Sequence, residues 1–335
     1  MNISPPTLSS PRFLSTLSLL PLRTLTLTHP THEHRHAHMS AASGLVQIDE
    51  WIYVVADDEN HLGIFNCHNH ESGILQRLFS GDLPPTLEER KAEKPDLEVL
   101  TLIPVSEKYP QGALLGLGSG SKESRTQGII IPLDNQGGLQ ADVEIINLTS
   151  LYQQLKKEAG KLNIEGAVII NENIILFQRG NKKSRINASI RLPLEQFYQH
   201  VLSSSSESTN YKHTTQLNVK IIHYELGEIG GVPLCFTDAT PLPNGEIIFT
   251  AAAENTSDAY LDGACLGSAI GIINSAGELH SIHSIDKVVK VEGVQAKIVA
   301  NKIHLLLVTD ADDATTAAQL YSAELIGYPF ADAKN

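Results

Sequence analysis

The sequence has little of what marks several large protein classes. Its 335 residues include three cysteines, Cys67, Cys235 and Cys265, with no CxxC pair, which indicates free thiols in a reducing compartment. Lysine and arginine number 25 against 38 aspartates and glutamates, and the formal charge of −13 argues against a nucleic-acid partner. Walker loops, Rossmann fingerprints, GxSxG elbows and HExxH motifs are absent.

Long apolar runs are also missing. No segment approaches the roughly 18 apolar residues needed to cross a bilayer, so no membrane partner is expected. The apolar segment Phe13–Leu22 follows Arg12, but polar residues and Pro21 interrupt it and no small-x-small cleavage site follows closely. We therefore expect a soluble, cytoplasmic protein, with a secretory signal or an organelle transit peptide as alternatives.

What the chain does have is a short phrase that occurs five times. In each copy an oxygen-bearing side chain precedes a small or β-branched residue and an apolar segment that reads as a strand. The copies centre on Ser43, Glu98, Glu165, Asp238 and Glu292. Their unequal spacing, between 54 and 73 residues, fits repeats of one small sheet with loops of variable length.

A second strand and a polar turn follow each phrase. The predicted second strands are Trp51–Ala56, Ala113–Leu117, Asn173–Gln178, Glu246–Ala252 and Ile303–Thr309. The turns after them begin at Asp57, Gly118, Arg179, Glu254 and Asp310. This order of strand, turn, strand and polar turn is typical of a β-propeller blade, whose first strands line a central channel.

We therefore predict an all-β protein with one five-bladed propeller over residues 41–328, with six blades as the alternative. Residues 1–40 are predicted to be a largely disordered extension. Within it, Leu22–Leu27 alternates like a strand and is expected to close the ring by pairing with Gln319–Ile326. Leu148–Glu158 is the best helix candidate, ending at Gly160, and Leu83–Pro95 reads as a charged loop.

If the five phrases are equivalent, their side chains converge on the channel axis. Two carboxylates about 5 Å apart repel by roughly 3 kcal/mol at an effective dielectric of 20, so four cannot all stay ionised without compensation. An all-oxygen ring suits a hard cation, and its breadth favours Ca²⁺. The predicted metal ligands are Ser43, Glu98, Glu165, Asp238 and Glu292. The alternative is that these acids bind only water and backbone amides.

The polar turns are candidates for a small-anion site beside the cation. Gly118–Ser121 offers successive backbone amides and hydroxyls, and nearby arginines suit bidentate contacts to phosphate or carboxylate. The predicted ligand-binding residues are Ser119, Ser121, Arg125, Arg179, Asn181 and Glu254. Asp57, Asp58, Glu254 and Asp310–Asp313 are candidates for a general base. The alternative is that these are ordinary hairpin loops and solvated turns.

Alternating histidines at 32, 34, 36 and 38 form a possible transition-metal site, or else a solvated linker.

The ring of one serine and several acids resembles the calcium-activated nucleotidases (apyrases), which are five-bladed propellers with a central calcium. Ser43, Glu98, Glu165 and Glu292 match, and Asp238 departs because that family more often has serine there. From about 42 to 326 the chain also resembles an uncharacterised family of bacterial propeller-like proteins with no assigned activity. The stretches that carry this resemblance are Ala113–Ser121, Asn163–Gly166, Gly231–Ala239, Ala253–Tyr260 and Val308–Asp313.

Two functions from different classes follow. The first is a metal-dependent hydrolase of an anionic or phosphorylated small molecule. The second is a non-catalytic propeller that binds a ligand or a protein, in which the cation only locks the blades. The sequence contains no recognisable nucleophile to identify a catalytic residue.

Overall fold

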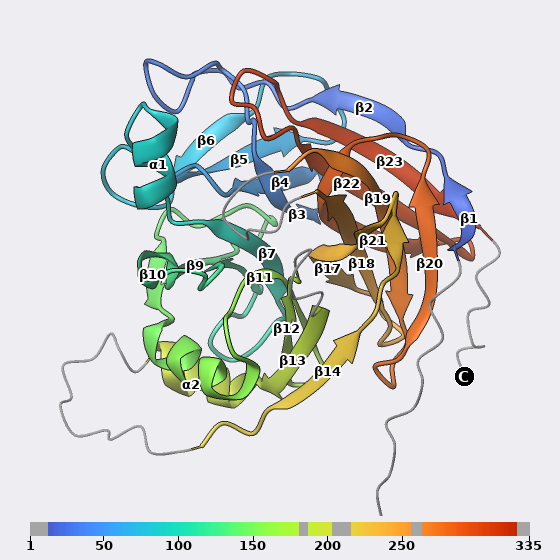
Figure 1. The fold of residues 1–335 in the computed structure, drawn as a ribbon. Coiled ribbons are helices and arrows are strands. Elements are labelled where there is room, and N and C mark those ends of the chain that lie inside the picture. The colour runs from blue at the N-terminus through green and yellow to red at the C-terminus, as the bar shows by residue number, and fades with distance from the viewer. Residues whose placement is uncertain (1–12, 181–186, 203–215, 256–262, 327–335) are drawn as a thin grey trace, which may run out of the picture.

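Five mainly antiparallel sheets form a ring around a common axis (Figure 1). The structure is a computed structural model that describes residues 13–180, 187–202, 216–255 and 263–326. The first strand of each sheet lies innermost, and these five strands contact one another in a closed circle. The chain is therefore a five-bladed β-propeller, and the six-bladed alternative is wrong.

The first three blades use consecutive strands. Blade 1 contains β3 (Ala42–Ile48), β4 (Trp51–Ala56), β5 (His61–Asn66) and β6 (Ile74–Arg77). Blade 2 contains β7 (Leu97–Ile103), β8 (Ala113–Gly118), β9 (Gln127–Pro132) and β10 (Glu144–Asn147). Blade 3 contains β11 (Ile164–Ile170), β12 (Asn173–Gln178), β13 (Asn187–Pro193) and β14 (Lys220–Tyr224).

The last two blades combine both ends of the chain. Blade 4 contains β17 (Cys235–Pro241), β18 (Ile247–Glu254), β19 (Cys265–Ile273) and β20 (Leu279–Ile285), with β1 (Phe13–Leu17) added in parallel at its outer edge. Blade 5 contains β21 (Lys290–Val299), β22 (Lys302–Asp310) and β23 (Gln319–Leu325), with β2 (Leu20–Thr24) as its outermost strand. A two-stranded hairpin of β15 (Glu228–Ile229) and β16 (Val232–Pro233) lies between blades 3 and 4 along the chain.

The N-terminal segment differs from the prediction. The expected partner strands do pair, but the N-terminal one spans Leu20–Thr24 rather than Leu22–Leu27 and is antiparallel to β23. Residues 13–40 are not a disordered extension, because they contain β1, β2 and backbone bridges at Thr26 and Leu27. Residues 1–12 lie outside the described residues.

Helices are few and lie outside the ring. The predicted helix is present as α2 (Thr149–Ala159), which ends at Gly160 with φ 78°. The predicted loop 83–95 instead contains α1 (Leu87–Glu93), and α3 (Leu194–Leu202) follows β13 without having been predicted. A 3₁₀ turn, η1, spans Glu123–Arg125. Within the described residues, none of the helices is long and apolar enough to cross a membrane.

The apolar core is divided among the blade interfaces. The described residues form one buried cluster between each pair of neighbouring blades, and the cluster between blades 5 and 1 joins Leu320 and Val308 to Leu45 and Val54. Burial at about 25 cal/mol per Å² of apolar surface makes these interfaces the main source of stability. The ring is therefore held together at its interfaces, and the axis is left to polar groups.

Candidate functional site: a charged cluster at one end of the axis

The inner strand of every blade is irregular at the same place. Each first strand carries an extra residue where its pairing to the second strand slips by one, which is the pattern of a β-bulge. The bulged residues are Ser43, Glu98, Glu165, Thr237 and Glu292. The repeat phrase is therefore structurally real, but its fourth copy was placed one residue too late, because Thr237 and not Asp238 occupies the equivalent position.

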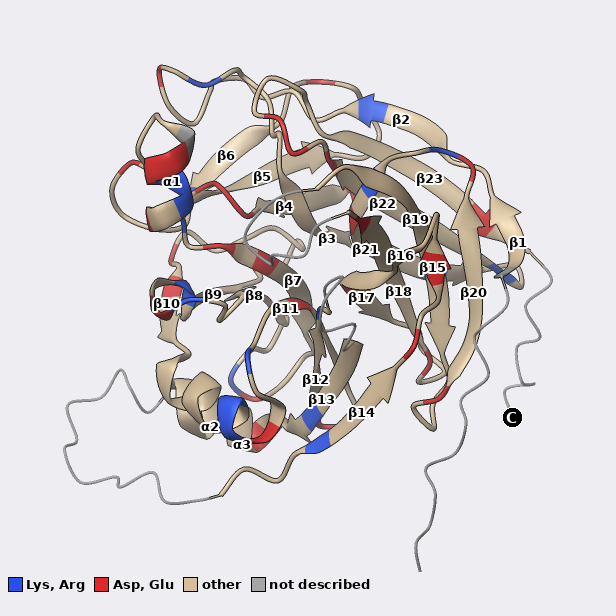
Figure 2. Ribbon diagram, in the orientation of Figure 1, with Lys and Arg blue, Asp and Glu red and all other residues tan. Residues whose placement is uncertain are grey.

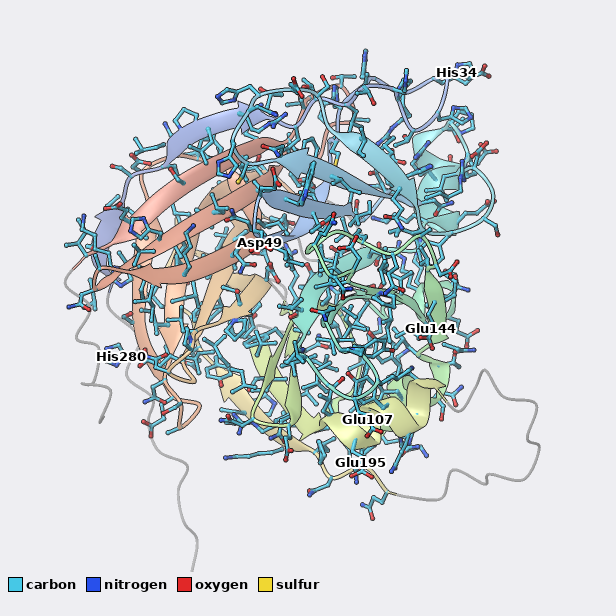
Figure 3. The ribbon with its side chains drawn as sticks, turned by 180° about the vertical axis from the view of Figure 1, so that it is seen from behind. His34, Asp49, Glu107, Glu144, Glu195 and His280 are labelled. Atoms are coloured by element: carbon cyan, nitrogen blue, oxygen red, sulfur yellow. The ribbon has the colours of Figure 1, made fainter. Side chains whose placement is uncertain are left out.

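These bulges mark one end of the axis. The second strand of each blade runs antiparallel to the first and so ends beside the bulge, whereas Asp49, in the β3–β4 turn at the far end of β3, is labelled in the view from behind (Figure 3). Acidic and basic segments gather near the centre of the ring at the ends of the inner strands (Figure 2).

In blade 4, the residues at the bulge form hydrogen bonds to the first strand of blade 5. Thr237 Oγ1 donates to the carbonyl oxygen of Val291 at 2.8 Å, and Asp238 Oδ2 accepts from the backbone nitrogen of Val294 at 2.8 Å. Burial, more than any neighbouring charge, raises the pKa of Asp238 well above its ordinary value. The contact of Asp238 Oδ2 connects blades 4 and 5, and among the described residues its Oδ1 has no hydrogen-bond partner.

Ser43 is likewise engaged by the backbone. Its hydroxyl donates to the carbonyl oxygen of Ala41 at 3.2 Å and accepts from the backbone nitrogen of Asp57 at 3.1 Å. These bonds hold the start of the first strand against the turn that follows the second. Of the five predicted metal ligands, Ser43 and Asp238 therefore have protein partners already.

Arg179 lies among three carboxylates from three blades. Its guanidinium is 2.9 Å from Glu165, 2.6 Å from Glu254 and 3.7 Å from Glu292. Only 13% of the Arg179 side chain is exposed, so these are buried ion pairs, in which each charge needs its partner. The arginine predicted to hold an anionic ligand thus binds acids of the protein itself.

Lys290 completes this half of the cluster. Its ammonium lies 3.0 Å from Glu292, 3.3 Å from Glu254 and 3.2 Å from Asp310. Burial would raise the pKa of Glu254, but Arg179 and Lys290 outweigh it and lower that pKa to about 2. Burial raises the pKa of Glu292 to about 8 despite the same two cations. Arg179 and Lys290 together thus do not neutralise the carboxylates that surround them.

The predicted small-anion site at Gly118–Ser121 is present, but the group bound there is a carboxylate of the protein itself. Ser119 and Arg125 both donate to Asp96 Oδ2, the arginine at 2.8 Å, and Arg125 also donates to Ser121 Oγ at 2.9 Å. Asp96 is 2% exposed and has φ 57°, a left-handed conformation uncommon for aspartate. The Gly118–Ser121 turn is therefore built around a carboxylate that immediately precedes β7.

Beside the Gly118–Ser121 turn lies a group of three acids. Asp57, Asp96 and Glu98 place carboxylate oxygens within 4.8 Å of one another. Lys94 contacts both Asp57 and Asp96, the latter at 2.9 Å. Burial raises the pKa of Asp57 to about 7, and burial together with the charge of Glu165 raises that of Glu98 well above its ordinary value. One ammonium therefore does not satisfy the three acids.

A further set of ion pairs lies toward the first blade. Arg35 bonds Asp58 at 2.7 Å and Glu59 at 2.9 Å, and Arg90 donates to the carbonyl oxygen of Asp58 at 2.9 Å. Burial, and next the charge of Asp58, raises the pKa of Glu59 to about 7.

Together these groups form what we call the axial charge cluster. Among the described residues, its eleven carboxylates come from Asp57, Asp58, Glu59, Asp96, Glu98, Glu165, Asp238, Glu254, Glu292, Asp310 and Asp312, and its six cations from Arg35, Arg90, Lys94, Arg125, Arg179 and Lys290. The excess of five acids favours protonation or the binding of a metal ion.

Several members of this cluster were not predicted from the sequence. Lys94 lies in the predicted loop 83–95, and neither Asp96 nor Lys290 was singled out. A signal was present, because Asp96 and Lys290 each stand two residues before a bulged glutamate. Asn163 stands at the same offset and donates to Glu165. Polar residues at this offset line the same end of the axis.

Two other predictions have simpler outcomes. Asn181 lies outside the described residues. Among the described residues, the histidines at 32–38 form no group of three side chains close enough to share a metal ion. Their rings instead contact one another in two pairs, His32 with His34 at a tilt and His36 stacked on His38, and His38 hydrogen-bonds the carbonyl oxygen of Ala314.

The chain belongs to a family of unknown function, DUF6929, whose model matches residues 38–325. No curated protein matches the chain.

Solved structures with similar folds are distant. A glycosyl hydrolase from Bacteroides ovatus aligns at 9% identity and a TM-score of 0.42, covering 95% of each chain. A chain of a nidogen/laminin complex aligns at 11% identity and a TM-score of 0.42, covering 89% of this chain and 90% of that one. An endo-arabinanase from Bacillus licheniformis aligns at 12% identity and a TM-score of 0.40, covering 89% and 96%.

Proposed function

We propose that this propeller binds a divalent cation, with Ca²⁺ as the expected ion, at Asp57, Asp96 and Glu98. The observation that carries the proposal is the convergence of these three carboxylates within 4.8 Å. Hard oxygen ligands suit calcium, which accepts six to eight of them and tolerates water among them. This group replaces the five-residue ring, because Glu165 and Glu292 face Arg179 and Lys290, and Ser43 and Asp238 have backbone partners.

Lys94 is the competitor for this ion. Lys94 pairs with Asp57 and Asp96, so a cation at this group has to compete with the ammonium for both carboxylates. The raised pKa values of Asp57 and Glu98 supply a second marker, because acids that carry protons at neutral pH release them when a metal ion binds.

We infer a non-catalytic binding role rather than hydrolysis. A hydrolase needs groups free to hold an anionic substrate, and the two arginines predicted for that task are engaged inside the protein. Arg179 pairs with Glu165 and Glu254, and Arg125 pairs with Asp96. A panel of phosphate and ester substrates is expected to show no turnover with calcium present, and turnover would restore the hydrolase alternative.

The metal site is tested by Glu98→Gln. Removal of one carboxylate ligand should weaken calcium binding by at least about tenfold in isothermal titration calorimetry. The control Glu324→Gln removes an acid on β23 that pairs with Lys302 on β22, and it should leave the affinity unchanged. Titration of the wild type near pH 7 in buffers of different ionisation enthalpy should show proton release. Equal calcium affinity of Glu98→Gln and the wild type would remove the site.

A further inference from the structure

A pocket of about 570 Å³ lies between blades 4 and 5, beside the axial charge cluster. Its volume falls within the range of about 300–1,000 Å³ that is typical of small-molecule sites. It is lined by the start of β19, the link between β20 and β21, the end of β22 with the turn after it, and β23. Its charged lining residues are Lys290, Asp310 and Asp312, and the rest of its lining is uncharged.

One wall of this pocket is apolar and open to solvent. Val288, in the link between the two blades, is 73% exposed, and Val289 and Tyr321 also line the pocket and are half-buried. Val289 and Tyr321 pack against the apolar cluster between blades 4 and 5, so the wall continues that cluster to the surface. Covering such a wall with the apolar body of a ligand is favourable because it removes apolar surface from water.

The charged end of the pocket is acidic and within reach of a ligand. The Asp312 side chain is 20% exposed, against 10% for Asp310 and 9% for Lys290. Asp312 Oδ1 accepts from Lys290 at 2.7 Å, and among the described residues Oδ2 has no hydrogen-bond partner. One oxygen of an accessible carboxylate is therefore available to a donor in the pocket.

The single cation of the lining is not available to an anion. The ammonium of Lys290 has three donors, and it already contacts four carboxylates at 2.7–3.3 Å, those of Glu254, Glu292, Asp310 and Asp312. An anionic ligand would meet Asp310 and Asp312 without a free cation to pair with. The charges of the pocket thus select against anions and in favour of a cation.

We propose that this pocket binds a primary ammonium that carries a compact apolar body, as an arylalkylamine does. The ammonium donates to the carboxylate of Asp312, and the body covers Val288, Val289 and the ring of Tyr321. A hydrogen bond between two ionised groups is stronger than one between neutral groups, and an aromatic ring face adds attraction for a cation. The proposal goes beyond the proposed metal site and does not depend on it, because none of Asp57, Asp96 and Glu98 lines this pocket.

The test compares four probes on the wild-type protein in chelator at pH 8. Burial raises the pKa of Asp312 to about 7, so its carboxylate is ionised there, and an alkylammonium with a pKa near the lysine value of about 10.4 keeps its charge. Phenethylamine should bind in isothermal titration calorimetry. Phenethyl alcohol, which lacks the charge, hydrocinnamate, which reverses it, and methylammonium, which lacks the apolar body, should each bind at least about tenfold more weakly.

Each other result with these probes overturns the proposal. Phenethyl alcohol that binds as tightly as phenethylamine would show an apolar pocket without selection for charge. Equal binding of hydrocinnamate would show an anion site, and equal binding of methylammonium would show a simple cation site. No binding by any of the four probes would also refute the proposal, and because the chelator removes calcium, none of these results bears on the metal site.

Variants assign the two ends of the ligand. Asp312→Asn should weaken phenethylamine binding by about tenfold or more and leave the weaker binding of phenethyl alcohol unchanged. Asparagine suits this position because Asp312 has φ 52°, a left-handed conformation that asparagine also adopts. Val288→Ser should weaken the binding of both ligands by about threefold or more, because it removes part of the apolar wall.

Two matched controls should leave both affinities unchanged. Asp82→Asn removes an exposed acid that pairs with Arg77, and Val105→Ser changes a valine that is also 73% exposed but lies outside the pocket. Unchanged phenethylamine affinity in folded Asp312→Asn would refute the proposal. If that variant fails to fold by circular dichroism, the comparison of the four probes on the wild type still decides.

Discussion

Arg179 illustrates how one buried side chain can serve structure where a binding role was expected. It lies within ion-pair distance of Glu165, Glu254 and Glu292, which belong to blades 3, 4 and 5. The guanidinium offers five donors in a rigid plane, so a single arginine can bridge several carboxylates. Removal of this residue leaves three acids buried near one another with Lys290 as the nearest cation.

Arg179→Met should therefore be strongly destabilising. We expect a loss of about 3–5 kcal/mol in the free energy of unfolding near pH 7.5, because a broken buried pair leaves uncompensated charge. Part of this loss should be recovered near pH 5.5, where the orphaned acids take up protons. Urea unfolding measures both values. Arg77→Met, which removes an exposed pair with Asp82, should change stability by less than about 0.5 kcal/mol. A loss for Arg179→Met as small as this control would contradict the structural role.

Asp238 gives a second test at this scale. Its carboxyl accepts from the backbone of Val294, and burial raises its pKa, so its neutral form fits the site. Asp238→Asn keeps that acceptor and should cost less than about 1 kcal/mol, whereas Asp238→Ala leaves the Val294 nitrogen unpaired and should cost about 1–3 kcal/mol. Thermal and urea unfolding distinguish them. Loss of calcium binding in Asp238→Asn would instead support the original prediction that Asp238 is a metal ligand.

At the scale of elements, the bulged inner strands bring neighbouring blades close together. A Cβ built on Gly166 would lie 2.8 Å from the backbone nitrogen of Ala239, and one on Gly44 would lie 2.9 Å from that of Leu100. These glycines directly follow the bulged residues. They allow the backbone of one inner strand to approach the next, which places the polar bulges near the axis.

Gly166→Ala should consequently strain the ring. The added methyl group meets backbone atoms of β17, which cannot rotate away, so we expect destabilisation of about 1–3 kcal/mol or more. Gly63→Ala is the comparison, because the nearest atom there is Sδ of Met39 at the flexible end of a side chain. Urea unfolding of the two variants should show the larger loss for Gly166→Ala. The reverse order would mean that the inner strands have room to separate.

The elements were more predictable than their contacts. The second strand of blade 1 and that of blade 3 match their predicted ranges, because an apolar run bounded by polar turns is a local signal. The short helix at 87–93 was missed because its charged sequence lacks an apolar face. The fourth repeat was misplaced by one residue because Asp238 looked more like the other acids than Thr237 does. The pairing of Arg179 and Asp96 with internal charges could not be foreseen, since it depends on how four loops meet in space.

At the scale of the whole molecule, apolar and polar interactions are separated. Apolar clusters occupy the five blade interfaces, and the axial charge cluster occupies one end of the axis. The interfaces supply the stability that keeps an excess of buried acids together. The protonation state of the axial charge cluster therefore depends on pH and on bound cations. A change in that protonation state changes the free energy of unfolding of the whole ring.

Stability should accordingly fall as pH rises through the neutral range. Burial raises the pKa of Glu292 to about 8 and those of Asp57 and Glu59 to about 7, above the values of unfolded carboxyl groups. Between about pH 4.5 and 8 the folded state holds protons that the unfolded state has released, so the free energy of unfolding decreases by up to about 1.4 kcal/mol per pH unit for each such group. Glu254, with its lowered pKa, acts in the opposite direction only at more acidic pH.

Calcium should reduce the pH dependence of the free energy of unfolding if it binds at Asp57, Asp96 and Glu98. A bound divalent ion favours the ionised forms of Asp57 and Glu98, so the protein gains most from calcium at the alkaline end of the range. Urea unfolding at about pH 5.5, 7 and 8.5, with chelator or with calcium, measures both slopes. A free energy of unfolding that rises with pH in chelator would contradict the buried excess of acids. A negative slope that calcium leaves unchanged would keep the charge cluster but separate it from any metal site.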